Sequence, residues 1–442
     1  MSEDNSTSVQ LEPRLQNRNA LLYAAVVSLT YLGAPALYVG FVQASLCKHL
    51  NTSNTMANLP ATVFLAMVWV SVVVAWLFPQ ARLLKTALSF AYGSMAGASA
   101  LVAVVLISGL PDGFVIASLI VHAGVVGAAS SVVGVMNWEV LGRGVSGRFR
   151  GKALSFAFGW GPGFAVIGSL GTQLLLNGEL FKWVPPDWLV VAYPFNYAIL
   201  FIGSTGCMVL AAFLVRRYQI PLPPVDVERE SFSTALVGGF KSFLSNRILL
   251  IASLAYLLVY CANMVQINMT IFTQEAVGRM PQELAGYQLF LRFSFKMACG
   301  FFLGWLLIRT NPKVPLLVTA GLQIAGVLWV LMVPGYWFML AFGINGAGEL
   351  FGVYYMNYPM LCSAKSQIRR NLSFLILISS LVGLSPVMYG WISDTWNIRA
   401  SFYAALAIMI FTTLLVIFKL PARPKPRTED LKAEREAQGA AG

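Results

Sequence analysis

The sequence contains little charge. Asp, Glu, Lys and Arg make up only 11% of its 442 residues, whereas hydrophobic residues make up 57%. Soluble proteins carry about 25% charged residues, so this chain lacks the charge needed to cover a soluble globular surface. Its mean hydropathy of +0.71 agrees. We conclude that the chain works inside a membrane.

Residues that support enzyme chemistry are also scarce. Only two histidines occur, His49 and His122, and the five cysteines stand singly without the paired spacing of a metal site or a disulfide framework. The run 144–152 resembles a phosphate loop but has Ser146 at the first required glycine. We expect no enzyme activity, no bound metal and no cofactor.

Twelve apolar stretches fill the chain instead, and each is long enough to cross a bilayer as a helix. Backbone groups in hydrocarbon must form hydrogen bonds within their own segment, so the stretches should be helical and the protein an all-α polytopic membrane protein. They are 20–46, 57–78, 86–108, 114–138, 153–176, 189–215, 247–272, 284–308, 314–333, 336–360, 372–393 and 400–419.

Basic residues predict the orientation of these spans. If the N-terminus is cytoplasmic, 24 of the 30 Lys and Arg residues lie on the cytoplasmic side. This bias predicts that both termini are cytoplasmic, in a multi-pass protein of the cell (inner or plasma) membrane. The basic residues are spread over seven segments, which favours contact with anionic lipid and gives no support for nucleic-acid binding.

One long polar interruption divides the spans into two halves. We expect two six-helix bundles, separated by a cytoplasmic loop that contains a short amphipathic helix and followed by a disordered cytoplasmic tail. The divisions are a cytoplasmic segment 1–19, a bundle 20–215, the loop 216–246, a bundle 247–419 and the tail 420–442. An offset of 227 residues relates Arg82 to Arg309 and His122 to Glu349, as in parallel repeats of transporters.

Short loops carry a resemblance to a known family. The basic loop that begins at Asn137 and ends at Lys152, and the segment from Gly304 to Arg309 followed by Lys313, are similar to conserved loops of the major facilitator superfamily. The resemblance implies alternating access around a midplane site lined by the first, fourth, seventh and tenth spans. It also implies that four basic residues lie in gating loops: Arg82, Lys85, Arg309 and Lys313.

Four ionisable residues fall deep inside spans, namely His122, Arg292, Lys296 and Glu349. Each costs about 2.5–3.5 kcal/mol to insert, so each needs a reason to be there. Arg292 and Lys296 are four residues apart and therefore share one helix face. One interpretation is that Glu349 pairs with them and only locks helices together. The other is that this layer faces a water-filled cavity and binds substrate or a proton.

The second interpretation leads to a specific function. Two positive charges against one negative charge should attract an anion, and a guanidinium can hold a carboxylate with two parallel hydrogen bonds. We therefore predict that Arg292 and Lys296 bind an organic anion. Glu349 is the first candidate for proton coupling, and His122 is the second because its ordinary pKa is close to neutral.

Polar residues on neighbouring spans extend the predicted substrate site. A stripe with helical spacing runs along the seventh span, with Gln266 slightly off it. Two tyrosines share a face of the first span, and an asparagine precedes Glu349. Interhelical hydrogen bonding is the alternative role for each of them. The residues are Tyr256, Tyr260, Asn263, Tyr31, Tyr38 and Asn345.

Together these features predict a monomeric secondary active transporter that moves a small solute with protons or another coupling ion. A sugar, nucleoside or drug transporter of the same fold is an alternative, since Glu349 could neutralise the basic pair. A second alternative is a membrane receptor or assembly partner that keeps the fold but does not transport.

Overall fold

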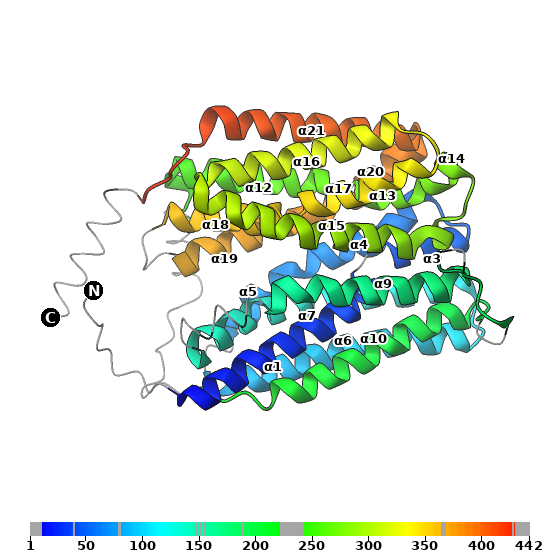
Figure 1. Ribbon diagram of the computed structural model, residues 1–442, viewed down its shortest axis with the longest axis horizontal. Helices are drawn as coiled ribbons and strands as arrows, with labels where there is room; N and C mark the ends of the chain where they lie inside the picture. The colour runs from blue at the N-terminus through cyan, green and yellow to red at the C-terminus, as the bar shows by residue number, and fades with distance from the viewer. Residues whose placement is uncertain are drawn as a thin grey trace.

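The computed structural model is an all-helical bundle whose helices run roughly along its long axis (Figure 1). It describes residues 11–38, 40–77, 81–145, 149, 153, 156–181, 183–187, 190–221, 240, 243–363, 368–426 and 428. The predicted amphipathic helix of the central loop and the predicted disordered tail lie largely outside these residues, as do residues 146–148 and 150–152 of the basic loop that begins at Asn137.

Helices from the first half of the chain form one side of the bundle. They are α1 (Pro13–Leu32), α2 (Ala34–Leu37), α3 (Val42–His49), α4 (Asn54–Ala66), α5 (Val70–Leu77), α6 (Leu84–Ile107), α7 (Asp112–Gly144), α9 (Gly161–Asn177) and α10 (Phe195–Val215).

Helices from the second half form the other side. They are α12 (Arg247–Asn263), α13 (Gln266–Ile271), α14 (Thr273–Val277), α15 (Pro281–Arg309), α16 (Lys313–Met332), α17 (Leu340–Gly348), α18 (Phe351–Leu361), α19 (Ile368–Ser379), α20 (Leu384–Thr395) and α21 (Ile398–Lys419). The start of α1 and the end of α21 lie at the same end of the bundle (Figure 1), which we call the terminal end; the opposite end is the distal end.

Among the described residues, nine helices are long and apolar enough to cross a membrane. This establishes a multi-pass membrane protein. Three expected spans, 20–46, 153–176 and 336–360, are not among these nine and consist of shorter helical pieces. Glycine and proline explain two of the breaks. Gly33 and Pro35 interrupt the first, and a π-helix, η3 (Phe156–Trp160), ends just before α9, which has Pro162 in its first turn. Twelve crossings and the cytoplasmic placement of the termini stay predictions.

The apolar core shows where the two halves meet. At the distal end one continuous cluster joins residues of both halves, including Phe41 and Phe201 from the first and Phe293 and Phe342 from the second. Toward the terminal end the core separates into one cluster within the first half and others within the second. The structure is therefore closed between its halves at the distal end.

Polar contacts reinforce this distal closure. Asp394 of α20 accepts hydrogen bonds from the backbone N–H groups of Asn54 and Thr55, at 2.9 and 2.8 Å, where α4 begins. A carboxylate is favourable there because the first N–H groups of a helix have no partners of their own. Deeper in, the buried Asn58 amide donates to the Asn268 side-chain oxygen across the halves at 2.8 Å.

Close contact between α9 and α15 completes the closure, and Gly286 makes it possible. A Cβ at this position would overlap the backbone of Gln173 on α9. The Gln173 side chain also bonds to α15, because its amide donates to the Glu283 carbonyl at 2.6 Å and its oxygen accepts from the Tyr287 N–H at 3.1 Å.

Replacing Gly286 by alanine should therefore open the distal end. Overpacking of this kind costs on the order of 1–3 kcal/mol, and the halves can relieve it by separating. Cys47 is a natural probe, since it is fully buried in the shared distal cluster. With the other four cysteines replaced, we expect maleimide labelling of Cys47 to rise severalfold.

The matched control is Gly300→Ala on the same helix, because a Cβ there meets no atom within 4 Å. This control should leave the labelling unchanged. Equal labelling of both variants would mean that the α9–α15 contact does not hold the distal end closed.

Candidate functional site

A break in the second half positions the central carboxylate. The helix α17 ends at Gly348, Glu349 occupies its C-cap position, and α18 starts at Phe351. One turn earlier, Gly346 packs directly on the backbone of Arg292, where a Cβ would overlap the Arg292 carbonyl. Because residues three apart lie on the same helix face, this approach brings Glu349 to the Arg292 side chain.

Arg292 and Glu349 form a buried, two-point ion pair. The Arg292 Nε donates to Glu349 Oε2 at 2.9 Å, and the Arg292 Nη2 contacts Glu349 Oε1. The two side chains are only 1% and 3% exposed. Parallel bonds of this type are among the strongest polar contacts in proteins, and losing one partner of a buried pair is costly.

Two further residues share the Glu349 carboxylate. Lys296, one turn after Arg292 on α15, lies with its Nζ 3.2 Å from Oε2. The Gln266 amide, at the start of α13, donates to Oε1 at 2.6 Å. Both oxygens of Glu349 are thereby used by donors of the second half. The centre holds two positive charges and one negative charge, so its net charge is +1.

The first half of the chain contributes an aromatic enclosure around Arg292. The Arg292 Nη2 donates to the Tyr38 hydroxyl at 2.8 Å. The guanidinium carbon lies 4.3 Å from the ring centre of Tyr38 and 4.5 Å from that of Phe41. Such cation–π contacts stabilise a desolvated cation. Arg292 is therefore a direct polar link between the two halves at the middle of the bundle.

One part of the guanidinium remains unsatisfied. The Arg292 Nη1 is buried and has no hydrogen-bond partner among the described residues. Buried donors are nearly always paired, so an orphaned one marks a place where a ligand or water binds. Two residues of the centre are partly exposed, since Tyr38 is 37% exposed and the Lys296 side chain is 19% exposed. The site therefore combines an unpaired donor, a surplus positive charge and two partly exposed neighbours.

Other predicted substrate residues divide into two groups. Tyr31 packs against the same ring as Tyr38, since both make edge-on contacts with Phe293 at 6.3 and 6.1 Å between ring centres. Tyr260 packs at a tilted angle against Tyr256 and meets Phe351 edge-on beside the α17–α18 break. Their hydroxyl roles stay predictions.

The two asparagines point elsewhere. The Asn263 oxygen accepts from the Gln323 amide at 3.2 Å, and the Asn345 amide donates to the Ala341 carbonyl at 3.0 Å. Asn345 also packs on Gly326 of α16. These contacts fit the alternative role predicted for polar side chains, hydrogen bonding within the bundle.

His122 lies within the first half and not at the charged centre. Its Nε2 is 3.3 Å from the Ser99 hydroxyl of α6, and its ring meets Phe201 of α10 edge-on at 5.3 Å. The side chain is fully buried, and its Nδ1 has no partner among the described residues. None of these contacts joins His122 to the charged centre, where the sequence analysis placed it.

The predicted gating residues lie at the terminal end. Arg82 lies in a short 3₁₀ helix, η2 (Ala81–Leu83), and Lys85 in the first turn of α6. Arg309 stacks on Trp305 at 4.9 Å. Lys313 donates to the carbonyls of Ile417 and Leu420, at 2.7 and 2.8 Å, and so caps the end of α21. A gating role for the four residues stays a prediction.

Sequence reasoning missed Gln266 and Phe41 as partners of this centre. Gln266 departs slightly from the helical stripe of the seventh span, because the helix breaks between α12 and α13 just before it. This departure from regular helical spacing was the signal in the sequence that could have identified Gln266. Phe41 lies in an apolar run and carries no pattern that would single it out.

Comparisons with known proteins agree with this architecture. No profile of a known protein family and no curated protein sequence matches the chain. Solved structures do match. A mutant of the nucleoside transporter NupG has a TM-score of 0.66 at 9% identity, with 91% of this chain and 100% of that one covered. A D-xylose–proton symporter has 0.65 at 12%, covering 91% and 98%.

FucP, described as a major facilitator superfamily transporter in its outward conformation, has a TM-score of 0.60 at 16% identity, with 91% of this chain and 100% of that one covered. Likeness at such low identity is a likeness of fold. The chain thus has the fold of major facilitator superfamily transporters.

Proposed function

We propose that this chain, which has the fold of the major facilitator superfamily, is a secondary active transporter that carries a small organic anion together with a proton. The observation that carries the proposal is the Arg292 guanidinium. It is buried at the junction of the two halves, it is held by Glu349 and Tyr38, and its Nη1 lacks a partner among the described residues.

A carboxylate is the substrate group that best suits this site. The centre has a net charge of +1, which an anion would neutralise. The Nη1 donors can bond one carboxylate oxygen, and the nearby ammonium of Lys296 supplies a second positive charge. The rings of Tyr38 and Phe41 beside the guanidinium could cover the apolar remainder of a small organic acid.

Glu349 gives a reason for proton coupling. It occupies the Arg292 Nε and Nη2, the donors that a second carboxylate would need for a two-point contact. Protonation of Glu349 removes its negative charge and frees those donors for the substrate. The site then has the same net charge when empty as when it holds one proton and one monoanion, so transport of the pair would be electroneutral.

Alternating access follows from the same contacts. The structure is closed at its distal end, and the Arg292–Tyr38 bond joins the halves at mid-depth. Opening the distal end must change this bond, because Tyr38 moves with the first half and Arg292 with the second. Substrate bound at Arg292 would therefore alter the balance between the two states.

Uptake into proteoliposomes tests the proposal. The purified protein is reconstituted as a monomer, its expected state, and tested with radiolabelled mono- and dicarboxylates, a sugar and a nucleoside under a pH gradient. We expect accumulation of a monocarboxylate that collapses when a protonophore is added. Binding without accumulation would instead identify a transport-inactive receptor.

A neutral substrate is the second candidate. The Arg292–Glu349 pair is intact in this structure, and the structural neighbours include proteins described as a nucleoside transporter and a D-xylose–proton symporter. In that case the ion pair would remain closed during transport, and the tyrosine hydroxyls would bind the solute. Accumulation of the sugar or nucleoside but of no organic acid would favour this candidate.

The Tyr38 hydroxyl offers a narrower prediction. The variant Tyr38→Phe keeps the ring beside the guanidinium but removes the acceptor for Arg292 Nη2. A hydrogen bond to a charged group contributes about 1.5–3 kcal/mol, so we expect KM for the anion to change by at least fivefold. The control Tyr336→Phe alters an exposed tyrosine at the distal end and should leave KM unchanged. If the two variants behave alike, Tyr38 does not act on the bound anion.

A further inference from the structure

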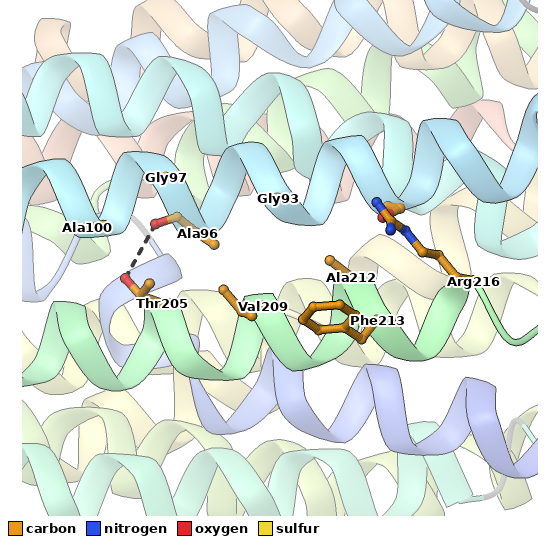
Figure 2. A pocket seen from close by; sticks show the side chains of 10 residues that line it. Gly93, Ala96, Gly97, Ala100, Thr205, Val209, Ala212, Phe213 and Arg216 are labelled. Atoms are coloured by element: carbon orange, nitrogen blue, oxygen red, sulfur yellow. Dashed lines mark hydrogen bonds between the residues drawn. The ribbon is translucent and has the colours of Figure 1, made fainter.

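A second site lies on the outer face of the first half, between α6 and α10. Here a groove of about 410 Å³ runs along the two helices, and Figure 2 shows the side chains that line it. Its floor on α6 consists of small residues, Gly93, Ala96, Gly97 and Ala100. A Cβ added at Gly93 or Gly97 meets no atom within 4 Å, so this space is open.

The groove lies on a face that a bilayer would cover. Both helices are long and apolar enough to span it. On the α10 side the groove is lined by Val209 and Phe213, which are 41% and 61% exposed. Its volume is within the range of about 300–1,000 Å³ typical of ligand sites. Because it is apolar and opens toward hydrocarbon, its natural filling is an acyl chain.

A basic residue lies at the mouth of the groove and favours a negatively charged ligand. At its terminal end Arg216 reaches from α10 toward α6 and donates to the Ser89 hydroxyl at 2.8 Å (Figure 2). Arg217 follows it, and Arg82 and Lys85 lie where α6 begins. The segments 81–93 and 205–221 contain no Asp or Glu. Arg216 therefore lies at one end of an apolar groove, and the chain segments that adjoin this end are basic. Such an arrangement is complementary to an anionic headgroup with an attached chain.

We propose that this groove binds an anionic phospholipid, with one acyl chain between α6 and α10 and the phosphate at Arg216. A hydrogen bond at each end fixes the separation of the helices: Arg216 to Ser89 at the mouth, and the Thr205 hydroxyl to the Ala96 carbonyl at 3.3 Å nearer the distal end. The groove is thus held open between two fixed points. The proposal is independent of the transported substrate.

Native mass spectrometry of the detergent-solubilised protein tests the site. The protein is titrated with dioleoyl phosphatidylglycerol or dioleoyl phosphatidylcholine, and bound lipids are counted. We expect phosphatidylglycerol to bind at least fivefold more tightly, about the effect of one basic residue near an anionic lipid. Arg216→Gln should remove this preference, whereas Lys419→Gln, which removes an exposed charge at the end of α21, should preserve it.

A second pair of variants tests the apolar part. Gly97→Leu fills the groove and should reduce binding of both lipids, whereas Gly203→Leu, at an open position of α10 that does not line the groove, should not. Equal affinity of the two lipids for the unmodified protein would overturn the proposal, as would a preference that survives Arg216→Gln. A dimer mass that disappears in Gly97→Leu would also overturn it, because the groove would then be filled by a second copy.

Discussion

Substituting Arg292 by glutamine is expected to abolish accumulation of the organic anion. The change removes the orphaned Nη1 donors, the ion pair with Glu349 and the hydrogen bond to Tyr38 at once. Uptake should fall to the level of empty liposomes. The measurement is initial uptake of the monocarboxylate found in the substrate screen, under a pH gradient.

Loss of folding must be separated from loss of binding in this variant. Breaking a buried ion pair costs about 3–5 kcal/mol because the remaining charge is uncompensated. The double variant Arg292→Gln with Glu349→Gln removes both charges and should recover most of the thermal stability, without recovering uptake. Recovery of both would show that Arg292 only locks the helices together, which is the alternative predicted from sequence.

The conservative variant Arg292→Lys refines the same experiment. A lysine keeps the charge but cannot offer two parallel bonds to a carboxylate. We expect it to remain folded and to raise KM for the anion by more than tenfold. Normal uptake by this variant would mean that charge alone, and not the geometry of the guanidinium, recognises the substrate.

Substituting Glu349 by glutamine should uncouple transport from the proton gradient while leaving exchange intact. For electroneutral transport of one proton with each anion, a gradient of one pH unit supports about tenfold accumulation, since one unit corresponds to about 1.36 kcal/mol. The variant imitates the protonated carboxyl, so it should only equilibrate the anion. The measurement is steady-state accumulation with and without the gradient, together with counterflow of labelled anion.

Glu139→Gln is the matched control for this variant. Glu139 is also a carboxylate in an ion pair, with Arg143 at 2.8 Å, but the pair lies within a single helix at the terminal end and is partly exposed. Its loss should leave accumulation unchanged. Gradient-driven accumulation by Glu349→Gln would contradict proton coupling through this residue, and counterflow by the same protein shows that it is folded.

Much of the architecture could be predicted from composition and pattern. Long apolar stretches indicated a helical membrane protein because lipid leaves the backbone no other partner than itself. The ionisable residues buried in those stretches pointed to Arg292, Lys296 and Glu349, since their insertion cost demands a reason. The i, i+4 spacing on α15 placed two of them on one face, and the structure brings both to Glu349.

Helix breaks limited what the pattern could predict. A regular stripe on the seventh span selected Tyr256, Tyr260 and Asn263 but left Gln266 slightly out of phase. The break between α12 and α13 turns Gln266 to Glu349 instead. Similarly, the position of His122 deep inside a span suggested that it joins the charged layer, yet its contacts lie within the first half, with Ser99 and Phe201. Depth along a span does not determine which neighbour a side chain faces.

The sequence by itself determined that the protein lies in a membrane, that it is helical and which ionisable residues are buried in its spans. These properties follow from the cost of placing polar groups in hydrocarbon. Only the tertiary structure decided which groups meet. Gly346 lets α17 approach α15 until Glu349 reaches Arg292, and the first half then brings Tyr38 and Phe41 around the guanidinium. Such contacts join residues about 250 positions apart, and no local pattern encodes them.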